Sequence, residues 1–202
     1  MKHTIIAGLL SLGLLAGAAC AQEGNKQDVT VSALGTFQQG TNGNGIHQTA
    51  TDSAGVLFSY RYFFTNHQGV ELNYGFNRFN QNFASLNTAA PTFTTVGVTS
   101  NTNEATASYV YRFGVLHRLT PYISAGTGAL VFVPNSFTGG STFATPDFVY
   151  SAGADLALSH KVTLRLGYRG HVFQAPDFGL AALNTGSVAH MAEPFGGLSF
   201  HF

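Results

Sequence analysis

Charged residues recur in stretches of the chain where apolar and polar side chains alternate. Four arginines and four acids occupy such stretches: Arg61, Arg112, Arg165 and Arg169, with Glu71, Glu104, Asp155 and Glu193. Opposite charges in equal number can form buried ion pairs, whereas a pathway for ions favours charges of one sign. The equal numbers therefore predict a network of ion pairs rather than a conducting channel.

Histidines could supply metal ligands or a catalytic base. Four of them fall one per turn or chain end: His67, His117, His160 and His201. A metal site would need several histidines to converge within a few ångströms, and these four belong to different turns. His171 shares the side of its segment with Arg169 and is interpreted as a structural histidine. We therefore expect no metal, no cofactor and no catalytic residue.

The elements that carry these residues have an apolar period of two. No stretch after the N-terminal region keeps a helical period for more than a turn or two. Eight strands are predicted, each close to or above the roughly 9–11 residues that a tilted strand needs to cross a bilayer. Their ranges are 28–38, 54–64, 69–79, 103–114, 121–133, 147–158, 162–174 and 190–202.

The connections between the predicted strands alternate between long and short. Residues 39–53, 80–102, 134–146 and 175–189 form the long ones, whereas 65–68, 114–120 and 159–161 form the short ones. Transmembrane barrels have short turns at one end and longer loops at the other. The polar long connections are predicted to be loops.

The two faces of the strands differ in chemistry along their whole length. The segment 162–172 places Leu164, Leu166 and Tyr168 on one face and Arg165 and Arg169 on the other. An interior face that is polar from end to end excludes the core of a soluble domain, but it suits a membrane barrel whose apolar face meets lipid. We predict an all-β fold, an eight-stranded antiparallel up-and-down transmembrane β-barrel.

Turn positions predict which charges meet inside this barrel. A turn centred on His160 places Asp155 opposite Arg165, and Arg61 and Glu71 flank the turn at residues 66–67 in the same way. Eight strands leave an interior just wide enough for side chains to fill. We therefore expect the charges to close the lumen, and we expect removal of Glu71 and Asp155 together to raise its conductance.

The direction of Glu193 in the last strand depends on whether that strand is regular or contains a bulge. Glu193 shares the inward face with Ser199 and His201, within reach of Arg169 or His171, as long as the strand is regular. Pro194 makes a bulge possible, and a bulge would turn Glu193 to the other face.

Composition agrees with a membrane protein and limits its partners. Of the 202 residues, 45% are hydrophobic and only 9% are charged, compared with about 25% charged residues in ordinary soluble domains. The formal net charge is zero, so the chain offers no basic surface for nucleic acid.

The N-terminus has the features of a secretory signal peptide. Lys2 precedes a short apolar core and a small-residue exit at Ala19-Cys20-Ala21. We predict a signal peptide over residues 1–21 and a barrel domain over residues 22–202. The alternative is lipoprotein processing at Cys20, which normally needs a Leu-like residue where this chain has Gly17.

The C-terminus is an alternating aromatic strand. Leu198, Phe200 and Phe202 share one face, with Ser199 and His201 between them. Chain ends usually fray, so a terminal strand of this kind indicates closure against the first strand.

Two motifs resemble the outer-membrane β-barrel superfamily, in particular the OmpA/OmpX-like small barrels. Residues 121–128, Pro-Tyr-Ile-Ser-Ala-Gly-Thr-Gly, are similar to its P-Y-x-x-A-G-x-G strand, and residues 60–75 are similar to its hairpin ending in GxELxYG. The resemblance implies residence in the cell outer membrane, with both termini periplasmic. It also implies that Leu198, Phe200 and Phe202 form the signal read by the barrel assembly machinery.

The expected role is structural or surface interaction by a monomer that contacts outer-membrane lipid and lipopolysaccharide. One alternative is a channel for small solutes or hydrophobic molecules. A second is a lipid-modifying hydrolase. The second is disfavoured because His171 is predicted to face inward and lacks the serine of the His-x-Ser-Asn pair in lipid A deacylases.

Overall fold

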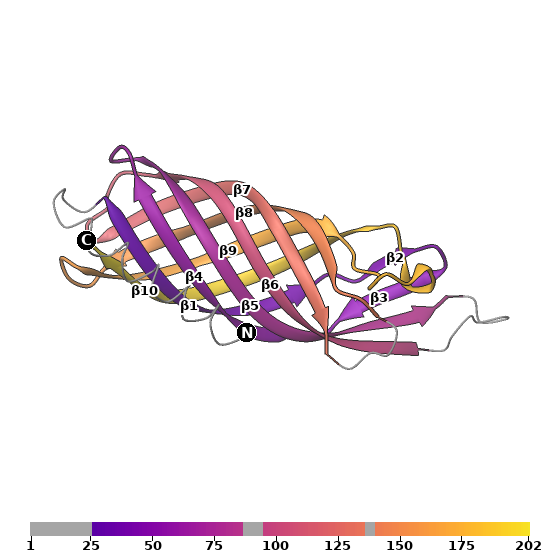
Figure 1. Ribbon diagram of the computed structural model, residues 1–202. Coiled ribbons are helices and arrows are strands. Elements are labelled where there is room, and N and C mark those ends of the chain that lie inside the picture. The colour runs from indigo at the N-terminus through magenta and orange to yellow at the C-terminus, as the bar shows by residue number, and fades with distance from the viewer. Residues whose placement is uncertain (1–25, 87–94, 136–139) are drawn as a thin grey trace, which may run out of the picture.

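The computed structural model describes residues 26–86, 95–135 and 140–202, and in them the chain forms one closed antiparallel β-barrel (Figure 1). The sheet runs in the order β2-β3-β5-β4-β1-β10-β9-β8-β7-β6, and an additional pairing of β5 with β6 closes it. Eight of these strands make the barrel wall, each paired with its neighbours along the chain. The predicted eight-stranded up-and-down barrel is confirmed. The predicted signal peptide, residues 1–21, lies outside the described residues.

The wall strands agree with the eight predicted segments and differ from them mainly in length. Their bounds are β1 Gln27–Gln38, β4 Ser53–Phe63, β5 Gln68–Ser85, β6 Thr95–Arg112, β7 Leu119–Pro134, β8 Phe143–Ala157, β9 Val162–Gln174 and β10 Val188–His201. The only helical segment in the described ranges is a 3₁₀ turn, η1, at Ala181–Leu183. No helix in those ranges is long and apolar enough to cross a membrane.

The prediction of a long loop at residues 80–102 is wrong for most of that stretch. β5 and β6 have 18 residues each, and their ladder runs without interruption from Gln68↔Tyr111 to Ala84↔Thr95. The many Asn and Thr residues suggested a loop, but the stretch has a period of two in burial, and its buried residues include Phe83 and Val98 as well as Gln81. The hairpin therefore extends well beyond the roughly 9–11 residues that cross a bilayer, and it projects from the barrel in Figure 1.

The connection at residues 39–53 is also more ordered than predicted. It contains β2 (Thr41–Gly43) and β3 (Ile46–Ala50), which pair with each other, and β3 pairs with the outer part of β5. Asn44 and Gly45 form the turn between them with φ of 50° and 75°. Positive φ at both central residues is what a two-residue hairpin turn requires, and Asn-Gly is the favoured sequence.

The outward face of the wall strands is apolar, as predicted. Large hydrophobic side chains that are at least 36% exposed come from all eight wall strands, among them Phe58, Leu72, Ile123, Phe148, Leu166 and Phe200. Their sequence neighbours point into the barrel and are buried. This alternation sets which charges face the interior.

Both faces change character toward the long-connection end of the barrel. On β5 the outward residues change from Tyr74 and Phe76 to Arg78 and Asn80, while the inward residues change from Asn77 to Phe79. The prediction of an interior that is polar from end to end is therefore wrong for the outer third of the longest strands. Beyond this level large apolar side chains point inward, as in a water-exposed sheet, and the buried polar residues Gln48 and Gln81 bind each other.

An apolar cluster fills the interior at the long-connection end. Its buried residues come from the strands, from the β2–β3 hairpin and from the segment between β9 and β10: Ile46, Phe79, Phe83, Val98, Leu130, Phe132, Phe173, Ala175, Phe178, Leu183, Ala189 and Met191. Residues 175–187 and the β2–β3 hairpin meet above it, where the Ser187 hydroxyl donates a hydrogen bond to the Asn42 carbonyl at 2.7 Å. The long connections thus cover the mouth of the barrel.

Candidate functional site

Two layers of charged side chains cross the lumen, one nearer the short connections and one deeper. We call the first the balanced layer because it has three arginines and three carboxylates: Asp28, Arg61, Glu71, Arg112, Asp155 and Arg165. They come from β1, β4, β5, β6, β8 and β9, at the ends of these strands next to the short connections. The layer therefore joins most of the wall across the interior.

Arg165 binds two carboxylates of the balanced layer. Its Nε lies 2.7 Å from Asp155 Oδ1, and its Nη2 lies 3.1 Å from Asp28 Oδ1. Asp155 and Arg165 are directly opposite each other in the β8–β9 ladder, where the turn at residue 160 predicts them. Arg165 is 1% exposed and Asp155 is 5% exposed, so the pair is largely desolvated.

The other two arginines of the layer combine ion pairs with aromatic contacts. Arg61 pairs with Glu71, its neighbour in the β4–β5 ladder, and stacks 4.0 Å above the Tyr122 ring. Arg112 lies 3.2 Å from Asp28 and 3.6 Å above the Phe63 ring. A cation above an aromatic face gains further electrostatic attraction when it is desolvated.

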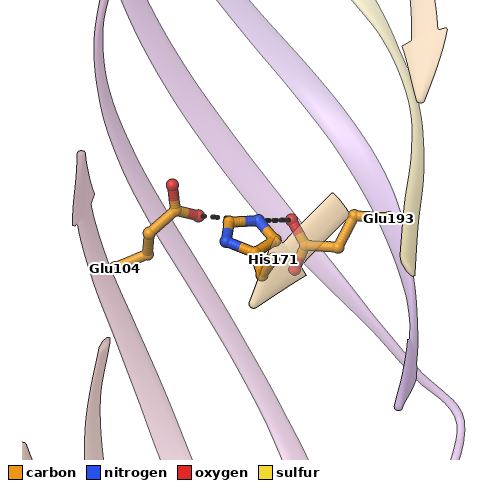
Figure 2. A group of neighbouring side chains, drawn as sticks. All are labelled: Glu104, His171 and Glu193. Atoms are coloured by element: carbon orange, nitrogen blue, oxygen red, sulfur yellow. Dashed lines mark hydrogen bonds and ion pairs between the residues drawn. The ribbon is translucent and has the colours of Figure 1, made fainter. Parts of the chain in front are cut away.

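The deeper layer has an excess of acid, and we call it the acidic layer. It consists of Glu104 on β6, Asp147 on β8, Arg169 and His171 on β9, and Glu193 on β10. Arg169 pairs with Glu104 and lies 3.3 Å from Glu193. His171 lies between carboxylates, with Nδ1 2.7 Å from Asp147 Oδ2 and Nε2 3.2 Å from Glu193 Oε2. Figure 2 shows His171 with Glu104 and Glu193.

All eight charges predicted to face the lumen lie in one of these two layers and take part in ion pairs. Sequence reasoning missed two members, Asp28 and Asp147, which were left at the edges of predicted strands. Asp28 has the same inward position as Thr30, and Asp147 the same as Ser151, so the alternation contained the signal. His171 was predicted to be a lumen histidine, but its position between two carboxylates depends on Asp147.

The four histidines predicted at turns or at a chain end are His67, His117, His160 and His201, and we call them the rim histidines. They do not form a site with one another. In the described ranges, the group of side chains that could share a metal ion is Glu104, His171 and Glu193, and it includes no rim histidine. His67 Nδ1 lies 2.9 Å from the Arg112 carbonyl, and His201 Nε2 lies 2.7 Å from the Thr163 hydroxyl. A cavity of about 300 Å³ at this end has His160 and His201 in its lining, below the balanced layer.

A closed antiparallel barrel with an apolar outer face and a charged interior is the architecture of a transmembrane barrel of the bacterial outer membrane. This chain belongs to the family of the outer membrane protein beta-barrel domain, which matches residues 7–190. Membership places the protein in the outer membrane.

Solved structures of outer-membrane barrels have the same fold. Neisserial surface protein A is 17% identical, with a TM-score of 0.60 over 90% of this chain and 100% of the other. OprG from Pseudomonas aeruginosa is 13% identical, with a TM-score of 0.61 over 89% and 97%. Ail, the attachment invasion locus protein of Yersinia pestis, is 14% identical, with a TM-score of 0.52 over 89% and 100%. A comparison with curated proteins finds no match.

Proposed function

We propose that the protein is a non-conducting outer-membrane barrel that anchors a protruding β-sheet for contacts at the cell surface. The β5–β6 hairpin carries this proposal, because its strands are 18 residues long and their outward face becomes polar beyond Phe76. β3 widens the protruding part by pairing with β5 from Ile46↔Ser85 to Ala50↔Gln81. A sheet of this kind is a rigid platform rather than a set of loops.

Three levels of filling support a closed lumen. Arg61 and Arg165 in the balanced layer are 1% exposed, and Arg169 in the acidic layer is 2% exposed. Above them, Phe83 and Phe178 in the apolar cluster are fully buried. An apolar constriction resists water as well as ions, so the lumen has two chemically different barriers in series.

The orientation follows from the same asymmetry. In our proposal the long-connection end faces the outside and the short-connection end, with the end of β10, faces the periplasm. A signal peptide over residues 1–21 would direct export, and the assembly machinery would read Leu198, Phe200 and Phe202. The monomer would contact only lipid and lipopolysaccharide through its apolar belt, and no nucleic acid.

Catalysis on lipid is not part of the proposal. The hydrolase alternative needs a histidine at the lipid face, but His171 is fully buried and points into the lumen between Asp147 and Glu193. A lipid acyl chain outside the barrel has no contact with that imidazole.

A groove in the barrel side supports a second candidate function, passage of small hydrophobic molecules. The groove has a volume of about 300 Å³ and lies between residues 39–42 and residues 187–190, with Val172 also in its lining. Ala189 lines it and also belongs to the apolar cluster. An uptake assay with a hydrophobic dye in proteoliposomes tests this candidate, and faster uptake than in empty liposomes would favour it over the surface role.

Surface substitutions on the protruding hairpin test the first candidate. Asn80 and Asn82 lie on its outward face, so Asn80→Arg/Asn82→Arg alters the surface without touching the apolar cluster. Cells that display the wild-type protein or the variant would be compared for adherence to epithelial monolayers and for aggregation with one another. We expect the variant to lose most of the gain that the wild type confers.

A matched control keeps this test specific. His160→Arg places the same kind of charge on an exposed turn at the short-connection end, and adherence should remain at the wild-type level. Both variants should migrate on gels as folded, heat-modifiable barrels. Equal adherence of cells with wild type, with the double variant and with no barrel would reject the surface role.

A further inference from the structure

The acidic layer has more carboxylates than permanent cations. Its three carboxylates, Glu104, Asp147 and Glu193, are at most 5% exposed, and among the described residues Arg169 is the only arginine that contacts them. With a neutral imidazole at His171, two negative charges have no counter-charge in the layer. Buried charges persist when they are paired or when they coordinate a metal. A divalent cation would therefore balance the charge of the layer.

Three side chains of the layer present possible metal ligands to one point. The ligand atoms of Glu104, His171 and Glu193 all lie within 4.8 Å of one another. His171 Nε2 is 3.2 Å from Glu193 Oε2 and 4.0 Å from Glu104 Oε2. Zinc bonds of about 2.0–2.2 Å in a tetrahedron place neighbouring ligands roughly 3.3–3.6 Å apart. The Glu104 oxygen would therefore have to move closer to both of the other ligand atoms, by no more than about 1 Å. Figure 2 shows the imidazole between the two carboxylates.

The other ring nitrogen of His171 is already held by a carboxylate. Asp147 Oδ2 lies 2.7 Å from Nδ1. A hydrogen bond from Nδ1 to Asp147 leaves the lone pair of Nε2 directed at Glu104 and Glu193. Metal-bound histidines nearly always have such a partner, which fixes the ring and raises its basicity.

An unpartnered oxygen points to the same deficit of positive charge. Asp147 Oδ1 is buried and has no hydrogen-bond partner among the described residues. Asp147 itself is 2% exposed, so solvent does not compensate this oxygen. A metal ion on the far side of the His171 ring would draw charge through the imidazole and lower the cost of burying Asp147.

The surroundings hold both glutamates in place. Glu104 Oε1 accepts hydrogen bonds from Arg169 and from the Thr106 hydroxyl, which leaves Oε2 as the oxygen that faces His171. Glu193 Oε1 accepts from Asn77 Nδ2 at 3.4 Å, so its Oε2 faces the ring. Side chains fixed in this way need little reorganisation to bind an ion.

We propose that Glu104, His171 and Glu193 bind a divalent transition-metal ion, with water as a fourth ligand. One imidazole and two carboxylates form a nitrogen–oxygen ligand set that suits zinc. The ion ties β6 to β9 and β10 across the lumen and is a structural part of the barrel. This site is independent of the proposed surface role. Because the layer is sealed by the balanced layer and the apolar cluster, the metal enters while the barrel folds.

Refolding with zinc tests the proposal. The mature barrel, without a histidine tag, is refolded into detergent micelles with or without Zn²⁺, passed through a chelating column and analysed for metal by mass spectrometry. We expect about one zinc per chain and a higher unfolding temperature than for the zinc-free protein. His171→Gln should reduce the zinc content at least tenfold. Asp147→Asn, which weakens the orienting contact and removes one charge of the layer but none of the three ligands, should weaken binding about 10–100-fold.

Glu71→Gln is the matched control, because it removes a buried glutamate from the balanced layer instead. It should keep the full zinc content. Cobalt refolded into the wild type should show the visible absorption of a tetrahedral nitrogen–oxygen site, which remains informative if His171→Gln does not fold. Wild-type barrel with less than one zinc in ten chains, or equal zinc in Asp147→Asn and wild type, would overturn the proposal. The cation of the layer would then be a proton on His171.

Discussion

Glu193 on β10 lies directly opposite Arg169 on β9, with its Oε2 3.3 Å from Arg169 Nη1. The β9–β10 ladder continues through Pro194↔Tyr168 without a bulge, so Glu193 keeps the inward position that the alternation predicts. Pro194 instead disturbs the pairing of β10 with β1. The β1–β10 ladder is interrupted between Leu34↔Phe195 and Phe37↔Ala192, because Pro194 has no N–H to donate to β1.

The balanced layer predicts a large stability loss when one carboxylate is removed. Asp155 contacts Arg165, Arg61 and Arg112 at 2.7, 3.5 and 3.9 Å. Asp155→Asn leaves these arginines buried with too few acids, and we expect it to lower the free energy of unfolding by about 3–5 kcal/mol. The chain has no tryptophan, so urea unfolding would be followed by circular dichroism and by heat-modifiable migration.

Lys161→Gln is the control for this measurement, because Lys161 is an exposed charge in the turn that follows Asp155's strand. We expect it to change the free energy of unfolding by no more than about 0.5 kcal/mol. A loss below 1 kcal/mol for Asp155→Asn would mean that water reaches the layer.

Single-channel recording in planar bilayers should find no steady conductance for the wild type. From the sequence alone, removal of Glu71 and Asp155 together is expected to open the lumen. The apolar cluster changes this expectation, because Phe132 and Phe178 still close the mouth. We now expect Glu71→Ala/Asp155→Ala to remain closed.

We expect channel openings only when side chains of the balanced layer, the acidic layer and the apolar cluster are truncated together, as in Asp155→Ala/Arg169→Ala/Phe132→Ala. This variant removes one large or charged side chain from each of the three levels. Steady conductance from Glu71→Ala/Asp155→Ala alone would show that the apolar cluster is not a barrier.

The wall of the barrel and its charge pairs could be predicted because their signals are local. A period of two and a short turn fix which residues lie opposite each other, as for Asp155 and Arg165. The apolar cluster could not be predicted in the same way. Phe178 and Leu183 lie in a connection without periodicity, and they meet Phe83 only through the closed barrel. The third ligand of the proposed metal site, Glu104, likewise reaches His171 only across the lumen.

On the outward face, the loss of stability caused by an introduced charge should depend strongly on the depth of that charge in the bilayer. Leu72 is 53% exposed and lies in the apolar belt between Tyr60 and Ala107 of the neighbouring strands. Leu72→Arg should lower the free energy of unfolding in lipid bilayers by about 2–4 kcal/mol. Val188→Arg, at a 68% exposed position on the outer end of β10, should cost about 1 kcal/mol or less. Equal costs at both positions would place the bilayer elsewhere.

Gly126 in the motif at residues 121–128 is required by close approach of the neighbouring strand. A Cβ added to Gly126 would lie 2.1 Å from the Ala107 carbonyl oxygen and 2.5 Å from Ser108 Cα, both backbone atoms of β6. Gly126→Ala should therefore destabilise the barrel by about 1–3 kcal/mol through overpacking. Gly114→Ala is the control, since no atom lies within 4 Å of its added Cβ. A neutral Gly126→Ala would show that the β6–β7 pair can separate without cost.

Phe202 should matter for assembly in cells more than for stability. Its N–H donates a hydrogen bond to the Gln27 carbonyl at 3.1 Å, and its side chain is 38% exposed. Phe202→Ser keeps the backbone contact, and position 202 lies just beyond the end of β10, so refolding in detergent should give the same fraction of heat-modifiable barrel as the wild type. If the machinery reads the terminal aromatic, the amount of folded barrel in outer membranes should fall severalfold. Val29→Ser is the control, because it removes an outward side chain of similar exposure from β1 and leaves the C-terminus intact. A parallel loss for both variants, in cells and in detergent, would assign the effect of Phe202 to stability alone.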